Sequence, residues 1–577
     1  MVDELKHECA VALVVLRKDV DHYRTKYGTS DYGGVKLSLL LEKQHNRGQD
    51  GAGAAILRTN PEPGETPYWI AKSASATPLA DLLGTIAKRG KDTERIFLGP
   101  LRYATFGKNE VAFCHPFVHE ASDLAHTLLL AGNFNLTNAS ELFDDYRQHG
   151  SFPTSKADGY LITELISKEL AGGKDHASAL SSALANADGA WTLCGMTGDG
   201  WAFATRDPHG IRPGFCYVDD EVAVVASERP AIQAAFDVPP EAVKELPPGQ
   251  AFVISPSGEV SFKPLPHSND ITPCVFERIY FSRANDADIH RERKALGAAL
   301  VPSVLKAAGE PMENIFFSYI PNSARIAFHG LLEELFKCAL TQRHKDTEAQ
   351  RGNVLCASET PCLCVENIPR FGEVAVKDAK FRTFIADAAA RREFYKHVYD
   401  VTYGLVGKDD ALVVLDDSIV RGNTMKNAIL PMLSRLGPKR IVIASSAPPI
   451  RYPDCYGIDM STLGELVAFR ALVNLLGEDA NDILRDALAS EAKNPLEPLY
   501  ARFRDEQHAA EIARLLTPPG IGTEVAVVYQ TVDALHASCP GSSGDWYFTG
   551  NYPTPGGYKV LRKALRNYLE KNSERSY

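Results

Sequence analysis

The sequence lacks any apolar stretch long enough to cross a membrane as a helix, which takes about 20 residues, so we expect no membrane segment. It also lacks an excess of basic residues. The 62 Lys and Arg stand against 73 Asp and Glu, and the net charge of −11 argues against a broad nucleic-acid surface. The 11 cysteines show no paired spacing, which favours reduced thiols in the cytoplasm over a disulfide framework. The first ten residues, MVDELKHECA, are acidic and unlike a signal or transit peptide. These absences predict a cytoplasmic protein.

The chain also has no internal repeat and no low-complexity tract. Its hydrophobic content of 45% and charged content of 23% are ordinary for a globular protein. At 577 residues it is too long for one hydrophobic core, so we expect two domains or more.

The most informative stretch is 411–424, ALVVLDDSIVRGNT. Five apolar residues are followed by the acidic pair Asp416 and Asp417, then by a short glycine-containing loop and a helical pattern. This order predicts a buried parallel strand, a tight loop and a helix, and ligands of open α/β sheets bind at such strand ends. A loop that opens a helix offers N–H groups to a phosphate, while two carboxylates suit vicinal hydroxyls or a hydrated Mg²⁺. Together they describe a site for a ribose 5-phosphate.

The alternative interpretation is any strand–loop–helix of a Rossmann-like domain. The stretch, however, contains neither G-x-G-x-x-G nor G-x-x-x-x-G-K-[ST], so the two commonest nucleotide loops do not explain it. It resembles the D-D-S-I-V-R-G-x-T signature of type I phosphoribosyltransferases. That resemblance implies a phosphoribosyl diphosphate site made by Asp416, Asp417, Ser418, Ile419, Val420, Arg421, Gly422, Asn423 and Thr424.

The same resemblance extends to two further segments. Lys380 and Arg382 match a flexible loop that closes over diphosphate; a solvated basic patch is the alternative. Ser323 follows Asn322 where the family has an acid in its diphosphate loop; a turn before a helix is the alternative. The resemblance implies that Mg²⁺ is the cofactor, bound near Ser323, Asp416 and Asp417.

The N-terminal half contains a series of glycine-rich motifs after Cys9. A buried structural cysteine would be the ordinary interpretation. The motifs that follow are QHNRGQDGAG at 44–53, GPLRYAT at 99–105, AGNFNL at 131–136, ADG at 157–159 and RDPHGIRP at 206–213. In order and spacing they resemble the class II glutamine amidotransferase domain of the N-terminal-nucleophile hydrolases.

This second resemblance implies roles for individual residues. Cys9 would be the nucleophile, and Asn133 with the backbone N–H of Phe134 would form the oxyanion hole, although the family has glycine at the second position. Arg102 would bind the glutamine α-carboxylate and Asp158 the α-ammonium, against surface ion pairs as the alternative. The implied glutamine site comprises Arg47, Gly48, Arg102, Thr105 and Asp158.

The nucleophile of this class must become the first residue, because its α-amine has a pKa near 7.7–8.0 and serves as the base. The resemblance therefore implies that residues 1–8 are a propeptide removed before Cys9. If these residues stayed, the amine would be blocked and glutamine would not be used.

Taken together, the two motif sets resemble the amidophosphoribosyltransferase family, from Cys9 to about Leu466. We expect an N-terminal-nucleophile αββα sandwich at 9–265, an α/β type I phosphoribosyltransferase domain at 266–470 and a mainly helical C-terminal extension at 471–577. The expected reaction makes 5-phosphoribosylamine from glutamine and 5-phosphoribosyl diphosphate, the first step of purine synthesis. Purine nucleotide feedback inhibitors and a homo-oligomer are implied as well.

Some members of the family carry an iron–sulfur cluster on four cysteines. Here only Cys274 remains, since Asp454, Gly544 and Tyr547 occupy the other positions, so we expect no cluster. Two alternatives to the main function stay open. One is a glutaminase-impaired homologue that uses free ammonia, and the other is a non-catalytic phosphoribosyl-binding regulator.

Overall fold

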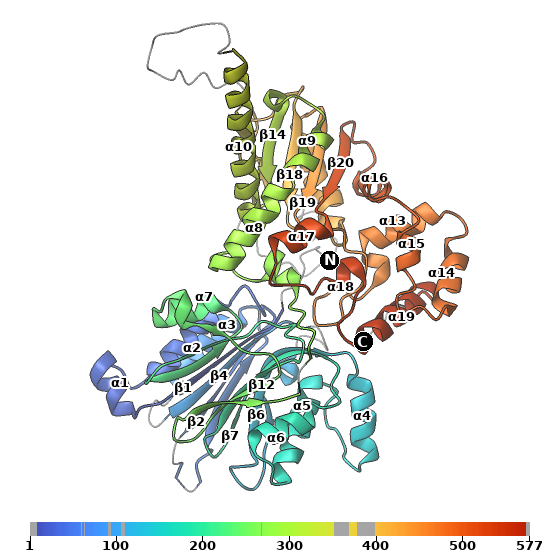
Figure 1. Ribbon diagram of the computed structural model, residues 1–577. Helices are drawn as coiled ribbons and strands as arrows, with labels where there is room; N and C mark the ends of the chain where they lie inside the picture. The colour runs from blue at the N-terminus through green and yellow to red at the C-terminus, as the bar shows by residue number, and fades with distance from the viewer. Residues whose placement is uncertain are drawn as a thin grey trace.

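The computed structural model describes residues 8–58, 61–62, 64–89, 94–104, 110–266, 268–350, 368–377 and 399–572, with side chains of 340–350, 377 and 399 excepted. The chain forms a layered N-terminal domain below a parallel-sheet domain in Figure 1, with C-terminal helices beside the second domain. No helix in these ranges has the length and apolar character that crossing a membrane would require.

The first sheet of the N-terminal domain is built around β1 (Ala10–Leu16), every residue of which is buried. Its strand order is β11-β9-β10-β1-β4-β2-β3. The other bounds are β2 (Gly51–Arg58), β3 (Tyr68–Ser73), β4 (Glu94–Arg102), β9 (Phe215–Val218), β10 (Val222–Ala226) and β11 (Lys244–Glu245).

The second sheet has the strand order β13-β12-β8-β7-β6-β5. Its strand β6 lies next to the edge strand β5 and pairs with β7 along its full length. The bounds are β5 (Phe117–His119), β6 (Leu128–Leu136), β7 (Gly189–Thr197), β8 (Ala202–Arg206), β12 (Gln250–Ile254) and β13 (Val260–Pro264).

The two sheets pack face to face because side chains alternate along each strand. Val11 and Leu13 of β1 meet Leu129 and Ala131 of β6 in the core between the sheets. The opposite face of the first sheet packs on α2 (Tyr32–Lys43), α3 (Pro78–Lys88) and α7 (Arg229–Phe236). The outer face of the second packs on α5 (Asp158–Ala171) and α6 (His176–Ala183). This arrangement confirms the predicted αββα sandwich; α1 (Val20–Tyr27) and α4 (Ala139–Gln148) lie at its edges.

The second domain contains a parallel sheet in the order β15-β14-β18-β19-β20. Its central strand is β18 (Ala411–Asp416), whose first five residues are all buried, as expected of a strand covered on both faces. The others are β14 (Ile315–Tyr319), β15 (Arg370–Phe371), β19 (Arg440–Ser445) and β20 (Glu524–Tyr529). A small separate pair joins β16 (Ala375–Lys377) to β17 (Tyr399–Val401).

Helices cover both faces of this sheet, as the α/β prediction requires. One face packs on α9 (Val301–Ala308) and α10 (Arg325–Gln350), with α8 (Ala287–Ala299) against α10. The other packs on α12 (Leu430–Ser434), α13 (Val467–Leu476) and α16 (Asp505–Leu516). The segment 471–577 supplies α14 (Ala480–Ala489), α15 (Glu497–Tyr500), α17 (Val532–Ser538), α18 (Trp546–Thr549) and α19 (Pro555–Leu569), together with the edge strand β20.

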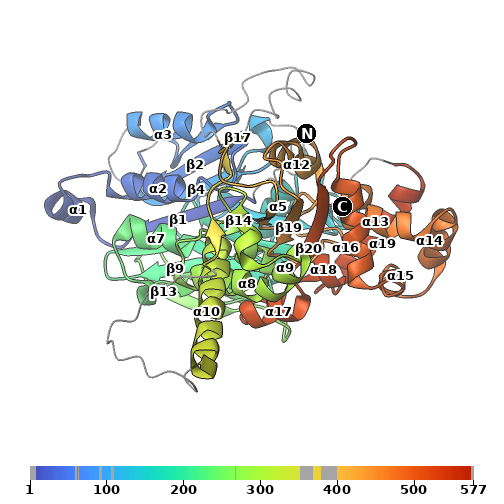
Figure 2. The same ribbon diagram turned by 90° about the horizontal axis from the view of Figure 1, so that it is seen from above.

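The two domains meet in one large apolar cluster. It joins Ile211 of the N-terminal domain to the crossing turn η3 (Glu277–Phe281) and to Trp546 and Tyr547 near the C-terminus. Figure 2 shows the C-terminal helices gathered on one side of the molecule. The crossing segment and the C-terminal part therefore hold the two domains together.

Candidate active sites

Cys9 lies immediately before β1, where Ala10 pairs with Leu101 of β4. Its Sγ accepts a hydrogen bond from the backbone N–H of Tyr103 at 3.3 Å. Burial raises the pKa of the thiol to about 12, the positive charge of Arg102 opposes that rise, and the charges of Asp158 and Asp50 add to it. In the chain that still carries Glu8, the thiol is therefore protonated at neutral pH.

Arg102 and Asp158 lie close to this thiol. Arg102 is the buried last residue of β4, and Asp158 opens α5. Burial raises the pKa of Asp158 to about 6, while backbone hydrogen bonds and the charge of Arg102 lower it. The charge of Arg102 lowers the pKa of both Cys9 and Asp158, so the three predicted residues share one site. Their individual roles in binding glutamine stay predictions.

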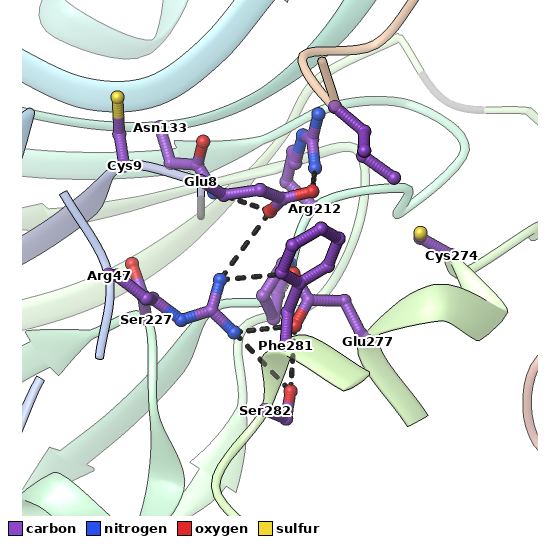
Figure 3. A network of polar contacts seen from close by, with 12 residues as sticks. Glu8, Cys9, Arg47, Asn133, Arg212, Ser227, Cys274, Glu277, Phe281 and Ser282 are labelled. Carbon is purple, nitrogen blue, oxygen red and sulfur yellow. Dashed lines mark hydrogen bonds and ion pairs between the residues drawn. The ribbon is translucent and has the colours of Figure 1, made fainter. Parts of the chain in front are cut away.

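Asn133 faces the same region from β6. Its side-chain N–H₂ donates to a carboxylate oxygen of Glu8 at 3.2 Å. Figure 3 shows Glu8 with its carboxylate between Asn133 and two arginines, beside Cys9. The amide expected to stabilise an oxyanion is thus engaged by the residue that precedes the nucleophile.

Phe134 lies within β6. Its side chain turns toward the outer helices and stacks on the ring of His115, with centroids 5.1 Å apart and planes 4° apart. A Cβ added at Gly159 would overlap the ring of Phe117 and come within 2.8 Å of Phe134 Cζ. The phenylalanine and the glycine after Asp158 therefore fit one another, and the ring of Phe134 is directed away from Asn133.

Arg47 is fully buried and is the centre of a network of charges. Its Nε donates to Glu228 at 2.7 Å, and its Nη1 donates to Glu277 at 3.0 Å and to Glu8 at 3.4 Å. Next to it, Gly48 lies against the backbone of Leu101. The guanidinium of Arg47 thus contacts three carboxylates of the protein itself, and its contact with glutamine stays a prediction. Thr105 lies outside the described residues.

The second site lies where β18 ends. Burial and the neighbouring charge of Asp417 raise the pKa of Asp416 well above its usual value. Burial also raises the pKa of Asp417, against hydrogen bonds from Ser323 and Ser418 and the charge of Arg293. Ser418 donates to Asp417 at 3.0 Å. The structure therefore brings together Ser323, Asp416 and Asp417, which are far apart in sequence.

The remaining residues of the predicted loop fall into three groups. Ile419 and Val420 are buried in separate apolar clusters, so only their backbones can face a ligand. Arg421 donates to the carboxylate of Glu465 at 2.7 Å and to the carbonyl of Asp459 at 2.9 Å. Gly422, Asn423 and Thr424 lead into the helical turn η5 (Met425–Ile429). Lys380 and Arg382 lie outside the described residues.

The four positions of the family's iron–sulfur cluster converge at the domain junction. Cys274 Sγ lies 3.4 Å from the Tyr547 hydroxyl, and Cys274 forms a backbone bridge with Gly544. Asp454 accepts a hydrogen bond from the Trp546 indole at 2.8 Å. One thiol and a tyrosine do not fit a cluster that needs four thiolates. Within the described ranges, no set of three or more His, Cys, Asp or Glu side chains is placed to hold a metal ion.

Sequence reasoning missed two residues of the first site, Glu8 and Arg212. Arg212 is 1% exposed and forms an ion pair with Glu8. It stands in the motif RDPHGIRP, but the motif gives no sign of its partner, which is more than 200 residues away. Glu8 lies in the segment expected to be removed, where no sequence motif marks a functional residue.

The fold and the two sites define a class of protein: an N-terminal-nucleophile amidotransferase sandwich joined in one chain to a type I phosphoribosyltransferase domain. Comparison with known proteins agrees with this class. Amidophosphoribosyltransferase from Synechocystis sp. is 29% identical over 466 residues, which are 78% of this chain and 81% of that protein. The corresponding protein of Methanocaldococcus jannaschii is 27% identical over 453 residues, 74% of this chain and 83% of that one.

Solved structures give the same result for the fold. The glutamine phosphoribosylpyrophosphate amidotransferase of B. subtilis, in complex with ADP and GMP, matches with a TM-score of 0.65 and 23% identity, over 95% of this chain and 97% of that one. A structure described as the allosteric regulatory enzyme of purine biosynthesis matches with a TM-score of 0.66. No family model matches the chain. The chain is a homologue of the amidophosphoribosyltransferases.

Proposed function

We propose that this chain is a glutamine-dependent amidophosphoribosyltransferase. It transfers ammonia from the glutamine side chain to C1 of 5-phosphoribosyl diphosphate and yields 5-phosphoribosylamine, diphosphate and glutamate, the first step of purine synthesis. The observation that carries this proposal is the pairing of two sites in one chain. A half-buried thiol beside Arg102 and Asp158 occupies one domain, and the acidic pair Asp416–Asp417 ends a parallel strand of the other.

In the glutaminase half, removal of residues 1–8 gives Cys9 a free α-amine that takes the thiol proton. The thiolate attacks the amide carbon of glutamine, releases ammonia and leaves a glutamyl thioester that water hydrolyses. Arg102 and Asp158 bind the two charged groups of the amino-acid end. Asn133 stabilises the oxyanion once Glu8 no longer contacts its amide.

In the phosphoribosyl half, Asp416 and Asp417 bind the ribose hydroxyls, and the loop backbone from Ser418 to Thr424 holds the 5-phosphate. The raised pKa values of the two carboxylates reflect burial together with the nearness of like charge, which a divalent cation would relieve. Ser323 and the two carboxylates offer the oxygen ligands that suit Mg²⁺, which when bound neutralises charge on diphosphate. Positioning and charge neutralisation account for this half of the reaction.

Several properties of the relatives belong to the same proposal. The domain divisions proposed are those at residues 8, 265 and 470, and Lys380 and Arg382 are proposed to supply positive charge to the diphosphate site. The B. subtilis structure contains ADP and GMP, which supports purine nucleotides as feedback inhibitors here as well. A homo-oligomer is proposed as well, on the family resemblance of the sequence motifs. The apolar cluster between the domains would shield ammonia from bulk water on its way to C1.

One alternative has support from a specific contact. Because Glu8 engages Asn133 at 3.2 Å, a chain that keeps residues 1–8 would use free ammonia and not glutamine.

The test measures diphosphate release from 5-phosphoribosyl diphosphate with either glutamine or ammonium chloride. We expect both nitrogen sources to work for the wild type and only ammonium for Cys9→Ala. If the wild type and Cys9→Ala release diphosphate at equal rates with ammonium, and the wild type does not use glutamine, the ammonia-only alternative is favoured. Absence of diphosphate release with either source would overturn the proposal.

A further inference from the structure

Arg212 is a fully buried guanidinium with one ionic partner among the described residues. The charge partner is Glu8, and none of its three nitrogens makes a hydrogen bond of standard geometry within the described part of the chain. Its Nη2 lies so close to Gly457 that a Cβ added there would come within 2.6 Å. Glu8 is thus the direct ion-pair partner of Arg212, whose charge also lowers the pKa values of the nearby buried carboxyls of Asp454 and Glu277.

Glu8 is 2% exposed, although it is the last residue of the segment whose removal is proposed. Its two carboxylate oxygens have different partners. One meets Arg212, and the other accepts from Arg47 at 3.4 Å and from Asn133 at 3.2 Å. A buried carboxylate is costly unless it is paired and hydrogen-bonded, and this one is both. Figure 3 shows that these partners surround the side chain immediately beside Cys9.

The partners of Glu8 are themselves fixed. Arg47 is oriented by Glu228 at 2.7 Å and by Glu277 at 3.0 Å. Asn133 lies in the middle of β6, which is paired along its length with β7. A pocket that is rigid before its occupant arrives can select for the occupant's shape and charge.

We propose that Arg47, Arg212 and Asn133 form a carboxylate-binding pocket that recognises the side chain of residue 8 and thereby sets the specificity of propeptide removal. Glu8 is a positioning residue in this reaction. By fixing the side chain, the pocket holds the peptide bond between Glu8 and Cys9 against the thiol of Cys9. The inference rests on the removal of residues 1–8 in the proposed function.

The removal step needs only the chain and water. The Cys9 sulfur bonds to the carbonyl carbon of Glu8, the bond from that carbon to the Cys9 nitrogen breaks, and the thiol proton passes to the nitrogen. The product is a thioester with a free α-amine. Water then adds to the thioester carbon, the carbon–sulfur bond breaks, and the released peptide 1–8 ends in a carboxylate while the thiol regains a proton.

The test follows the loss of residues 1–8 by intact mass after cell-free synthesis of the full chain. We expect Glu8→Ala to slow the loss by roughly tenfold to a hundredfold, the range of a lost charge-assisted hydrogen bond. Formate fits the space left by the missing carboxylate, so we expect millimolar formate to accelerate removal in Glu8→Ala. It should have no effect in the double variant Glu8→Ala/Arg212→Met, in which the pocket has lost the guanidinium that pairs with the Glu8 carboxylate.

The matched control is Glu94→Ala. Glu94 forms a similarly buried ion pair with Arg89 at 2.7 Å, at the opposite end of β4 from Arg102. This variant loses stability for the same reason as Glu8→Ala but leaves the pocket intact, so removal should proceed at the wild-type rate. Formate rescue is a further readout that a merely structural role of Glu8 would not produce.

Three outcomes would overturn the inference while leaving the proposed function standing. They are removal from Glu8→Ala at the wild-type rate, an equal slowing by Glu94→Ala, and no acceleration of Glu8→Ala by formate. Retention of residues 1–8 by the wild type would instead refute propeptide removal itself, and the inference with it.

Discussion

Replacing Asp158 by asparagine should make the protein more stable at neutral pH and unable to use glutamine. Burial raises the pKa of Asp158 from 3.8 to about 6 in the folded chain. Between these two values the folded state holds a proton that the unfolded state has lost. Stability therefore falls as the pH rises through this window, and it stays reduced above pH 6.

The size of the effect follows from the shift. About 2 pKa units at ~1.4 kcal/mol each give about 3 kcal/mol of lost stability above pH 7. Asp158 is half-buried and keeps some contact with solvent, so this figure is an upper bound. For a domain of this size, ~3 kcal/mol corresponds to roughly 6–12 °C in the unfolding temperature.

The assay compares the unfolding temperatures of wild type and Asp158→Asn from pH 4 to pH 8. The difference in favour of the variant should grow with pH and level off near pH 7, because only the wild type ionises at this position. In parallel, diphosphate release with ammonium should be kept and release with glutamine lost, since the α-ammonium has no partner. A stability difference that does not change with pH, or that favours the wild type more at pH 8 than at pH 4, would refute the assignment of this buried carboxylate.

Three further predictions concern the other parts of the two sites. Arg47→Met should lower the free energy of unfolding by about 3–5 kcal/mol because it leaves buried carboxylates unpaired. Arg485→Met, which breaks an exposed ion pair with Asp482, should lower it by less than about 1 kcal/mol, and chemical unfolding compares the two variants. Phe134→Ala should lower the free energy of unfolding by about 2 kcal/mol, because the half-buried ring loses its stack on His115. The variant should keep glutamine-dependent activity, since the backbone N–H remains. Loss of that activity at unchanged stability would contradict this prediction. Asp416→Asn should abolish diphosphate release with both nitrogen sources. It should also abolish the rise in unfolding temperature that Mg²⁺ with 5-phosphoribosyl diphosphate gives the wild type. An unchanged rise would show that this carboxylate is not part of the ligand site.

The second site could be predicted largely from local sequence. A continuous apolar strand, two acids and a loop before a helix occupy one stretch of fourteen residues, and the structure shows β18 ending at Asp416. The sandwich was predicted in another way, from the resemblance of the motif series after Cys9 to the class II glutamine amidotransferase domain, and not from strand periodicity. The edge strand β20 could not be placed in this way, since its partner β19 lies some 80 residues earlier and long-range pairing leaves no local trace.

The sequence alone determined the chemistry available to this protein: a thiol near the start, an acidic pair after a buried strand, and the residue types that bind an amino acid and a ribose phosphate. The tertiary structure decided which charges share a space. Glu8, Arg47, Asn133, Arg212 and Glu277 come from five separate segments, and only folding brings them into one buried network. Coulombic interaction depends on distance and burial, and neither quantity can be read along the chain.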